Sequence, residues 1–305
     1  MRGPPCAAPP ADADPVDVIS EHRLRHLDLL PAALADLPEG ERAHRLHAAF
    51  LDRIPYENLS NNLAVAEARD RPEAWMRATD RLLRENAAQG LGGTSFSLAY
   101  ALTDLMRGAG LQAHTTLGHN LVTERAHAAV VVYVEGAPLL FDPALLLCGP
   151  LPVRPGGILE DPLGRLELQP RCGATLTLTL RVCDALRDAR RAAARRDEGG
   201  AWSLVARRSD VRPVYSILPV PAPPPSFRQA WLASFCKGRA LPLRLARRRG
   251  NVIYRYGERP HTLEILTPTG CTEERLPPSP VARLVEVFGL DGECLGAWFR
   301  SRRRA

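Results

Sequence analysis

Apolar side chains recur at helical spacing through the N-terminal third of the chain. From residue 16 to residue 63 they return every three or four positions, and Pro31 and Pro38 break the pattern into short pieces. A further amphipathic stretch covers Glu73–Asn86, and a nearly unbroken apolar run, Phe96–Leu102, follows a glycine-rich turn at 90–93. This pattern predicts a small helical bundle that contains one buried helix.

Short β-branched runs replace the helical pattern after Gly110. Ala128–Val134 and Pro138–Phe141 flank Gly136 as the arms of a hairpin would, and residues 175–182 alternate with the period of a half-buried strand. Further strands are expected at 166–168, 202–206, 213–217, 243–245, 252–256 and 262–266, with helices at 227–236 and 280–288. Helices first, strands second and a mixture last indicate an α+β fold in segregated blocks.

These changes divide the chain into segments. We expect a disordered leader at 1–15, a helical domain at 16–111, a strand-rich domain at 112–208, a mixed domain at 209–298 and a basic tail at 299–305. Five prolines between residues 219 and 225 predict a stiff, extended connector inside the mixed domain.

The composition is that of an ordinary globular protein. Apolar residues make up 45% and charged residues 24% of the 305 positions, which excludes a disordered chain or a fibrous repeat. The 7 cysteines form no Cys-x-x-Cys pair, so we expect neither a zinc knuckle nor a disulfide framework, and reduced thiols favour a cytoplasmic location. No stretch approaches the ~20 apolar residues of a membrane span, and the proline-broken start is unlike a secretory signal. We therefore expect no membrane partner.

The excess of positive charge comes from arginine. Lys+Arg number 40 against 34 for Asp+Glu, a net charge of +6, with arginine runs at 187–196, 247–249 and 300–304. Such runs either bind a polyanion or are solvated surface. No aromatic residues interleave with them, as stacking on single strands would require. We therefore favour surface over a nucleic-acid partner, although the run at 247–249 also suits a ligand that carries phosphates.

A hydroxyl, an imidazole and a carboxylate lie at the ends of predicted elements, where they could come together in one site. The glycine turn places Thr94 and Ser95 at the start of the apolar helix, His127 opens a buried strand, and Asp142 closes the next strand of the hairpin. A carboxylate that holds an imidazole facing a hydroxyl is the orienter–base–nucleophile arrangement of covalent catalysis. The helix N-terminus would add N–H groups where an oxyanion forms. The same residues also suit a helix N-cap, a strand-end histidine and a turn aspartate before Pro143.

Two further histidines, His114 and His119, flank a strand-like piece and could form a metal pair. No third ligand follows at the spacing of a metal site, so a structural role is favoured and no metal is expected.

Several motifs resemble, in the same order, those of the arylamine N-acetyltransferases. Residues 54–59 read IPYENL where the family has IP(F/Y)ENL, and residues 91–96 read LGGTSF where it has RGG(Y/F)CF. His127 is similar to the family's catalytic histidine, and Phe141-Asp142, with an interval of 142 − 127 = 15, to the end of its LVDVGF strand. The Ser-Phe pair at 226–227 resembles the start of its C-terminal segment. The resemblance covers most of the chain.

The resemblance implies a helical N-terminal domain, a central β-barrel and a C-terminal α/β lid, in a fold similar to transglutaminases and papain-like peptidases. It also implies a triad in which acetyl-CoA acylates a cysteine and an amine accepts the acyl group. Ser95 holds the cysteine position here, with His127 as base and Asp142 as orienter. Supporting positions are those of the oxyanion turn, Gly92, Gly93, Thr94 and Phe96, and those expected to hold the loop beneath it, Glu57 and Asn58.

The departures from the family pattern affect the nucleophile itself. No other cysteine lies between Cys6 and Cys148, so no nearby thiol replaces the missing one. The arginine of the family's turn is Leu91 here, and its aromatic residue is Thr94. Three more positions differ, namely Ser97, Ala99 and the Pro143 that follows the aspartate.

Three activities fit these residues. The favoured one is a Ser–His–Asp acyltransferase that takes an acyl group from acetyl-CoA or another acyl thioester, presented by CoA or by an acyl-carrier protein, to a small-molecule acceptor. The alternatives are a protein that binds an acyl thioester without a covalent step, and a transglutaminase-like hydrolase. No permanently bound cofactor is expected in any of them.

Overall fold

The structure, a computed structural model, describes residues 21–303 apart from 69, 121–124, 163, 172, 174, 183–210, 239–241 and 258–260. The predicted leader, the strand expected at 202–206 and the arginine run at 187–196 lie outside the described residues. The helices are α1 (Glu21–His26), α2 (Pro31–Ala35), α3 (Glu39–Arg53), α4 (Leu59–Glu67), the 3-10 helix η1 (Pro72–Trp75), α5 (Thr79–Gln89), α6 (Ser95–Gly108), α8 (Pro224–Gly238), α9 (Val281–Phe288) and α10 (Gly292–Arg303).

Most of the strands follow α6 in the chain. They are β1 (Tyr56–Glu57), β2 (Gln112–Asn120), β3 (Arg125–Val134), β4 (Ala137–Phe141), β5 (Leu151–Pro152), β6 (Gly157–Asp161), β7 (Gly164–Pro170), β8 (Leu176–Val182), β9 (Val211–Ile217), β10 (Arg244–Arg249), β11 (Val252–Gly257), β12 (Thr262–Thr267) and β13 (Gly270–Arg275).

The helix α6 forms the centre of the N-terminal part. Its side chains are buried on almost every side, as its apolar sequence predicts, and they pack with α3, β3 and β4 in one core. The preceding helix α5 ends at Gly90, whose φ of +68° lies in the left-handed region that favours glycine. The chain therefore reverses there and enters α6 through the turn at 91–94.

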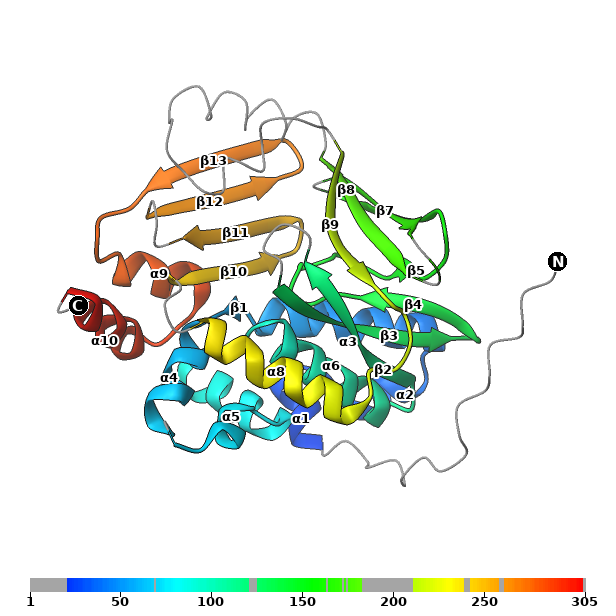
Figure 1. Ribbon diagram of the computed structural model, residues 1–305, viewed down its shortest axis with the longest axis horizontal. Coiled ribbons are helices and arrows are strands. Elements are labelled where there is room, and N and C mark those ends of the chain that lie inside the picture. The colour runs from blue at the N-terminus through cyan, green and yellow to red at the C-terminus, as the bar shows by residue number, and fades with distance from the viewer. Residues whose placement is uncertain are drawn as a thin grey trace.

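Two antiparallel sheets lie beside the helices (Figure 1). The larger has the order β5-β4-β3-β2-β9-β8-β7-β6, and its end strands β5 and β6 contact each other, so that the sheet nearly closes into a barrel. The smaller has the order β1-β10-β11-β12-β13 and is covered by α9 and α10. The predicted α+β fold, with a helical bundle, a central barrel and a C-terminal α/β part, is confirmed.

The structure moves two of the predicted boundaries. The strand β9, which the sequence assigns to the mixed domain beyond residue 208, pairs with β2 and β8 and is part of the barrel. The proline-rich segment at 219–225 follows β9 directly, and this is where the chain leaves the barrel. At the other end, α10 continues through most of the predicted basic tail because Phe299 is buried in the C-terminal core.

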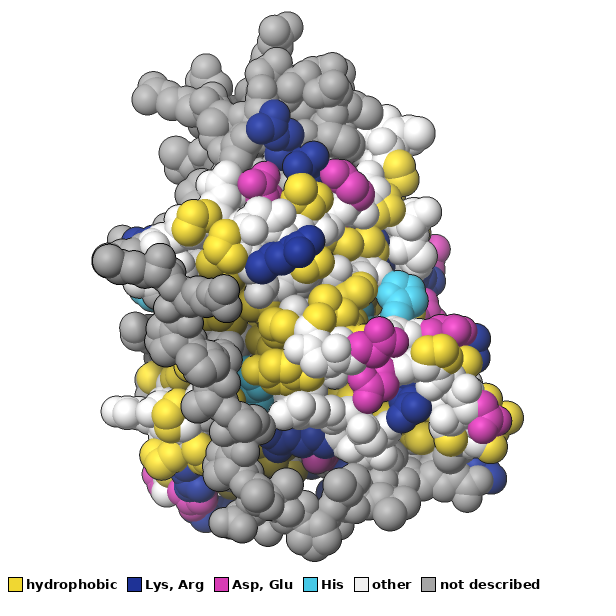
Figure 2. Space-filling view, turned by 90° about the vertical axis from the view of Figure 1, so that its right-hand side faces the viewer, with side chains coloured by type: hydrophobic (Ala, Val, Ile, Leu, Met, Phe, Trp, Pro, Cys, Tyr) yellow, Lys and Arg dark blue, Asp and Glu magenta, His cyan; other side chains and the backbone are white. Residues whose placement is uncertain are grey.

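The arginine run at 247–249 is not a solvated surface throughout. Arg247 donates to the carbonyl oxygens of Phe288 and Asp52, and Arg248 is 4% exposed. On the face shown in Figure 2, Lys and Arg side chains lie among Asp and Glu side chains instead of forming one basic area. Within the described part of the chain, no helix is long and apolar enough to cross a membrane.

The helix α3 carries a histidine that is completely buried. The edge of the His47 ring contacts Phe141, with ring centroids 5.0 Å apart, and neither ring nitrogen has a hydrogen-bond partner among the described residues. Burial lowers the pKa of His47 to about 3; the charges of His44 and Arg248 add to this effect, while that of Asp142 opposes it. The ring is therefore neutral in the folded protein at neutral pH.

This histidine should make the fold sensitive to acid. Below pH 6.5 the unfolded chain binds a proton at His47, whereas the folded chain stays unprotonated there down to about pH 3. The free energy of unfolding therefore falls as the pH falls from 6.5 to about 3. We expect a loss in the free energy of unfolding on the order of 1 kcal/mol per pH unit. Replacement His47→Phe should remove much of this slope, as measured by urea unfolding at several pH values.

The exposed His44, on the same helix, provides the matched control. His44→Gln should leave most of the acid sensitivity in place. An unchanged slope in His47→Phe would show that other groups, such as His114, cause it; burial lowers the pKa of His114 to about 4.

Candidate active site

The turn before α6 is held against residues 55–57 by backbone contacts. The Glu57 N–H donates to the Gly93 carbonyl at 3.0 Å, and the Gly93 N–H donates to the Pro55 carbonyl at 3.3 Å. A Cβ on Gly92 would lie 1.7 Å from the Pro55 oxygen, and one on Gly93 would lie 2.5 Å from Ser97 Oγ. Both glycines are therefore required by close packing, and together they fix where α6 begins.

Ser95 is the first residue of α6 and does not cap the helix. Thr94 takes the N-cap position with an extended backbone, and its side chain makes no capping hydrogen bond; its Oγ1 accepts a hydrogen bond from Asn61 Nδ2 at 3.4 Å. Ser95 is 8% exposed, and its hydroxyl has no hydrogen bond to any described residue. Ser95 is therefore not the N-cap, and no described residue binds its hydroxyl.

His127 and Asp142 form a buried pair at the end of the β3–β4 hairpin. The antiparallel register pairs Val130 with Phe141, which brings the next residue, Asp142, to His127. The Nε2 of His127 and the Oδ2 of Asp142 are 2.7 Å apart, and the two residues are 7% and 0% exposed. The two side chains are therefore in contact, and their catalytic roles stay a prediction.

The carboxylate of Asp142 is held in its charged form. Burial alone would raise the pKa of Asp142, but the charge and hydrogen bond of His127 and the backbone N–H of Leu145 outweigh it, so that the pKa lies below the usual value. The Oδ1 atom accepts from the N–H groups of Ala144, at 3.0 Å, and Leu145, at 2.9 Å. An ionised Asp142 keeps a proton on Nε2 of His127 and leaves Nδ1 as the basic nitrogen.

Tyr215 completes the surroundings of the pair and was missed by the sequence analysis. Its ring lies against His127, with centroids 4.5 Å apart, on the barrel strand β9. Burial, followed by the charge of Asp142, raises the pKa of Tyr215 well above its ordinary value, so the phenol stays protonated. The hydroxyl is close enough to influence Asp142, but it does not meet the geometry of a hydrogen bond to any described residue. Nothing in the sequence around Tyr215 indicates that its ring will contact His127.

The loop after Asp142 is anchored by the C-terminal sheet. Leu146 is buried in this loop with a φ of +59°, and its carbonyl accepts from Arg248 Nε at 2.6 Å. Arg248 also forms an ion pair with Asp161, whose carboxylate accepts from the N–H of Cys148 at 3.1 Å. The strained backbone of Leu146 is thus held in place by Arg248, which is itself paired with Asp161.

Ser95 and His127 lie on two elements that pack against each other, the helix α6 and the strand β3. Within the described residues, however, no hydrogen bond joins Ser95 to His127. Catalytic hydrogen bonds are often long or open without a ligand and tighten in the complex, so this geometry leaves the triad as a prediction.

The predicted supporting residues have different roles. Glu57 lies beneath the turn, fully buried, and accepts from the Ser60 N–H at 2.7 Å. Asn58 instead binds the C-terminal part, donating to the Pro242 carbonyl and accepting from the Arg244 N–H. The Phe96 ring points into the core and packs on Phe227, while its backbone N–H belongs to the first turn of α6.

The two histidines of β2 face opposite sides of the strand, and the thiol of Cys148 is not activated. On β2, His114 is buried and His119 is exposed, because residues five apart on a strand face opposite sides. Among the described residues, no group of three His, Cys, Asp or Glu side chains could hold a metal ion. Burial, and then Asp161, raise the pKa of the Cys148 thiol to about 12, so it is not an activated substitute for the missing cysteine.

Comparison with known proteins identifies the fold. No protein-family profile and no curated protein sequence matches the chain. Solved structures of arylamine N-acetyltransferases do match: that of Salmonella typhimurium has a TM-score of 0.67 at 17% identity and covers 92% of this chain and 97% of that one. A variant of the Mycobacterium smegmatis protein gives 0.68 at 19% identity over 92% and 96% of the two chains. The Mycobacterium marinum protein, in complex with CoA, gives 0.61 at 16% identity over 83% and 90%. The predicted resemblance is thereby confirmed at the level of the fold.

The packing of the turn can be tested by filling the space at Gly92. We expect Gly92→Ala to destabilise the protein by at least about 2 kcal/mol, because a Cβ placed 1.7 Å from a backbone oxygen forces the turn and residues 55–57 apart. Gly149→Ala, whose Cβ would lie 3.7 Å from its nearest neighbour, is the matched control and should have little effect. Urea unfolding measures both variants, and equal stabilities would contradict the tight contact.

Proposed function

We propose that this chain, which has the fold of the arylamine N-acetyltransferases, is an acyltransferase that uses Ser95 as nucleophile, His127 as general base and Asp142 as orienter. The observation that carries the proposal is the buried His127–Asp142 hydrogen bond of 2.7 Å. A protein that only binds its ligand has no need of a base whose orientation is fixed by an ionised carboxylate.

The buried pair suits proton transfer. Asp142 fixes the orientation of the imidazole and stabilises the imidazolium that forms when Nδ1 takes up a proton. Ser95 begins a helix whose first N–H groups have no partners within the helix, and these groups, with the helix dipole, favour the oxyanion of a tetrahedral intermediate. The Ser95 hydroxyl is available for reaction, because it makes no hydrogen bond to any residue that the structure describes.

Acyl transfer then takes two balanced steps. Ser95 Oγ attacks the carbonyl carbon of a thioester while its proton passes to His127; the C–S bond breaks, and His127 returns the proton to the leaving sulfur. An amine, or another nucleophile, next attacks the seryl ester and gives its proton to His127, and this proton returns to Ser95 Oγ as the C–O bond breaks. No cofactor other than the acyl donor takes part in either step.

The serine alters which reactions are favoured. A serine hydroxyl is much harder to ionise than a thiol, so the base has to act during the attack, and the seryl ester is a weaker acyl donor than a thioester. Strong nucleophiles such as hydrazines, or water, therefore suit the second step best. Acetyl-CoA, or another acyl thioester carried by CoA or by a carrier protein, is the proposed donor; the Mycobacterium marinum structure holds CoA in the same fold.

One observation favours a second candidate. The lack of a hydrogen bond between Ser95 and His127, within the described residues, agrees with a protein that binds an acyl thioester without forming an acyl-enzyme. The experiment that separates the two candidates has to detect the covalent intermediate.

Incubation with a panel of acyl-CoA donors should yield an acyl adduct at Ser95, detected by intact mass measurement and peptide mapping. Ser95→Ala should lose the adduct and keep the fold, because the hydroxyl it removes has no hydrogen bond to a described residue. Ser97→Ala, a second buried serine on α6, should keep it. Ligand binding without any adduct or turnover would support the non-covalent candidate instead.

Restoring the thiol provides a second test. If the pocket accepts thioesters and amines, Ser95→Cys should acetylate hydrazines or arylamines faster than the parent, because a thiolate forms with a far smaller proton-transfer cost than an alkoxide. The new thiol should also react with iodoacetamide at a lower pH than an ordinary thiol, whose pKa is about 8.5. An ordinary reactivity at position 95 would show that His127 is not its base.

A further inference from the structure

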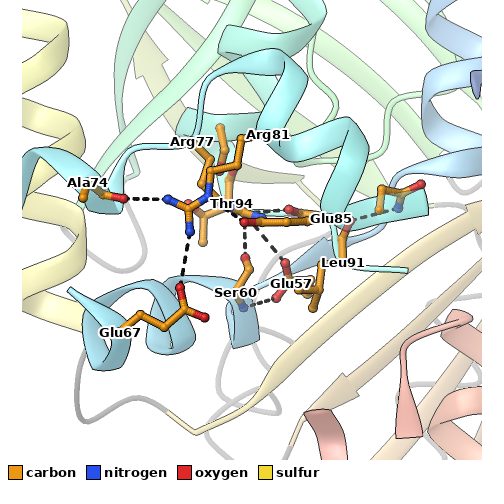
Figure 3. Close-up of polar contacts among 12 residues, drawn as sticks. Glu57, Ser60, Glu67, Ala74, Arg77, Arg81, Glu85, Leu91 and Thr94 are labelled. Carbon is orange, nitrogen blue, oxygen red and sulfur yellow. Dashed lines mark hydrogen bonds and ion pairs between the residues drawn. The ribbon is translucent and has the colours of Figure 1, made fainter. Parts of the chain in front are cut away.

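Arg77 is a cation buried directly beneath the turn that leads to Ser95. It lies between η1 and α5, is 1% exposed, and is among the largest fully buried side chains of the described residues. Its Nη2 donates to the Gly92 carbonyl and to Ser60 Oγ, each at 2.6 Å, and its Nη1 donates to Glu85 at 2.8 Å (Figure 3). Arg77 thereby joins α4, α5 and the turn in one network.

The charge of Arg77 is matched by two carboxylates. Glu85 receives a direct ion pair, and the Oε1 of Glu57 lies 4.0 Å from Arg77 Nη2. Glu57 is 0% exposed, and its Oε1 has no hydrogen-bond partner among the described residues, so this carboxylate depends on the nearby cation. Removing Arg77 would therefore leave the buried charge of Glu57 uncompensated, which is strongly destabilising.

The turn is shaped around the guanidinium. A Cβ on Gly93 would lie 2.8 Å from Arg77 Nη2, so glycine at this position leaves the space that Arg77 occupies. The planar guanidinium reaches the Gly92 carbonyl, Ser60 and Glu85 at once, whereas a lysine ammonium would be a single point of charge.

The cation at this turn does not come from the turn's own sequence. The motif that residues 91–96 resemble begins with arginine, but Leu91 is buried among apolar side chains of the C-terminal core. The cation at the turn comes instead from Arg77, 14 positions earlier (91 − 77 = 14) and from another element.

We propose that Arg77 is a positioning residue of this site: by holding the Gly92 carbonyl it sets the turn, and through the turn the direction in which Ser95 faces His127. The functional part of this inference rests on the proposed acyl transfer. Arg77 does not itself touch the reacting atoms.

The test compares two arginines that share one carboxylate. Arg81 forms an ion pair with Glu85 at 2.6 Å but contacts the Ala74 carbonyl and Glu67 rather than the turn (Figure 3). Arg77→Met and Arg81→Met are made in the Ser95→Cys protein, with Arg77→Lys as a milder variant should Arg77→Met fail to fold. Two quantities are measured: amide hydrogen exchange of a peptide spanning the turn, and the pH dependence of iodoacetamide alkylation at position 95.

We expect Arg77→Met to speed hydrogen exchange in the turn and to slow alkylation at neutral pH by about tenfold or more, because a thiol turned away from His127 regains an ordinary pKa. Arg77→Lys should have a smaller effect on both, and Arg81→Met should change neither.

The outcomes that overturn the inference are distinct. Unchanged exchange at the turn in Arg77→Met or Arg77→Lys would show that Arg77 does not hold it, whatever the chemistry of Ser95. Faster exchange together with an ordinary alkylation pKa in every variant, the parent Ser95→Cys included, would refute the proposed triad and with it the functional part of the inference. Equal effects of Arg81→Met and Arg77→Met would assign the role to Glu85 instead.

Discussion

The backbone contact between residues 55–57 and the turn at 92–93 connects the main parts of this molecule. On one side, β1 pairs with β10 of the C-terminal sheet; on the other, its residues bond to Gly93 at the entrance of α6. Two glycines are needed because any side chain at either position would overlap a neighbouring atom. The start of the central helix is therefore held by these backbone contacts together with the buried Arg77, which donates to the Gly92 carbonyl.

The candidate site combines groups from two differently built parts. The barrel supplies His127 from β3, Asp142 from the end of β4 and Tyr215 from β9, which is separated from β3 by β2. The helical part supplies Ser95 on a turn that is held by glycine packing and by the buried Arg77. The distance between Ser95 and His127 then depends on how α6 packs on β3. A ligand bound at this packing contact would therefore have the most influence on the site.

The fold and the His127–Asp142 pair could be predicted from the sequence, because they depend on local patterns and on motifs that follow one another in a fixed order along the chain. Gly136 and the apolar runs beside it define a hairpin, and the hairpin brings Asp142 to His127. Tyr215 could not be found in this way, since its strand joins the barrel through pairings between distant segments. Arg248 was also beyond reach: its neighbours in sequence are arginines typical of a surface, and only the contact of β10 with the loop at 146 makes it a buried residue.

The position of β1 also has a consequence for the order in which the protein forms. This strand lies within the first 60 residues, but its partner β10 begins at Arg244, so nearly two hundred residues separate two neighbouring strands. During synthesis the helical part can collapse around α6, while the sheet edge beside the glycine turn stays unpaired until the last quarter of the chain has left the ribosome. The hydrogen bonds of Asn58 to the backbone at 242 and 244 can likewise form only after this segment has been made. The region around Ser95 is thus completed late, and a nascent chain that stops before β10 would carry the candidate nucleophile without its finished support.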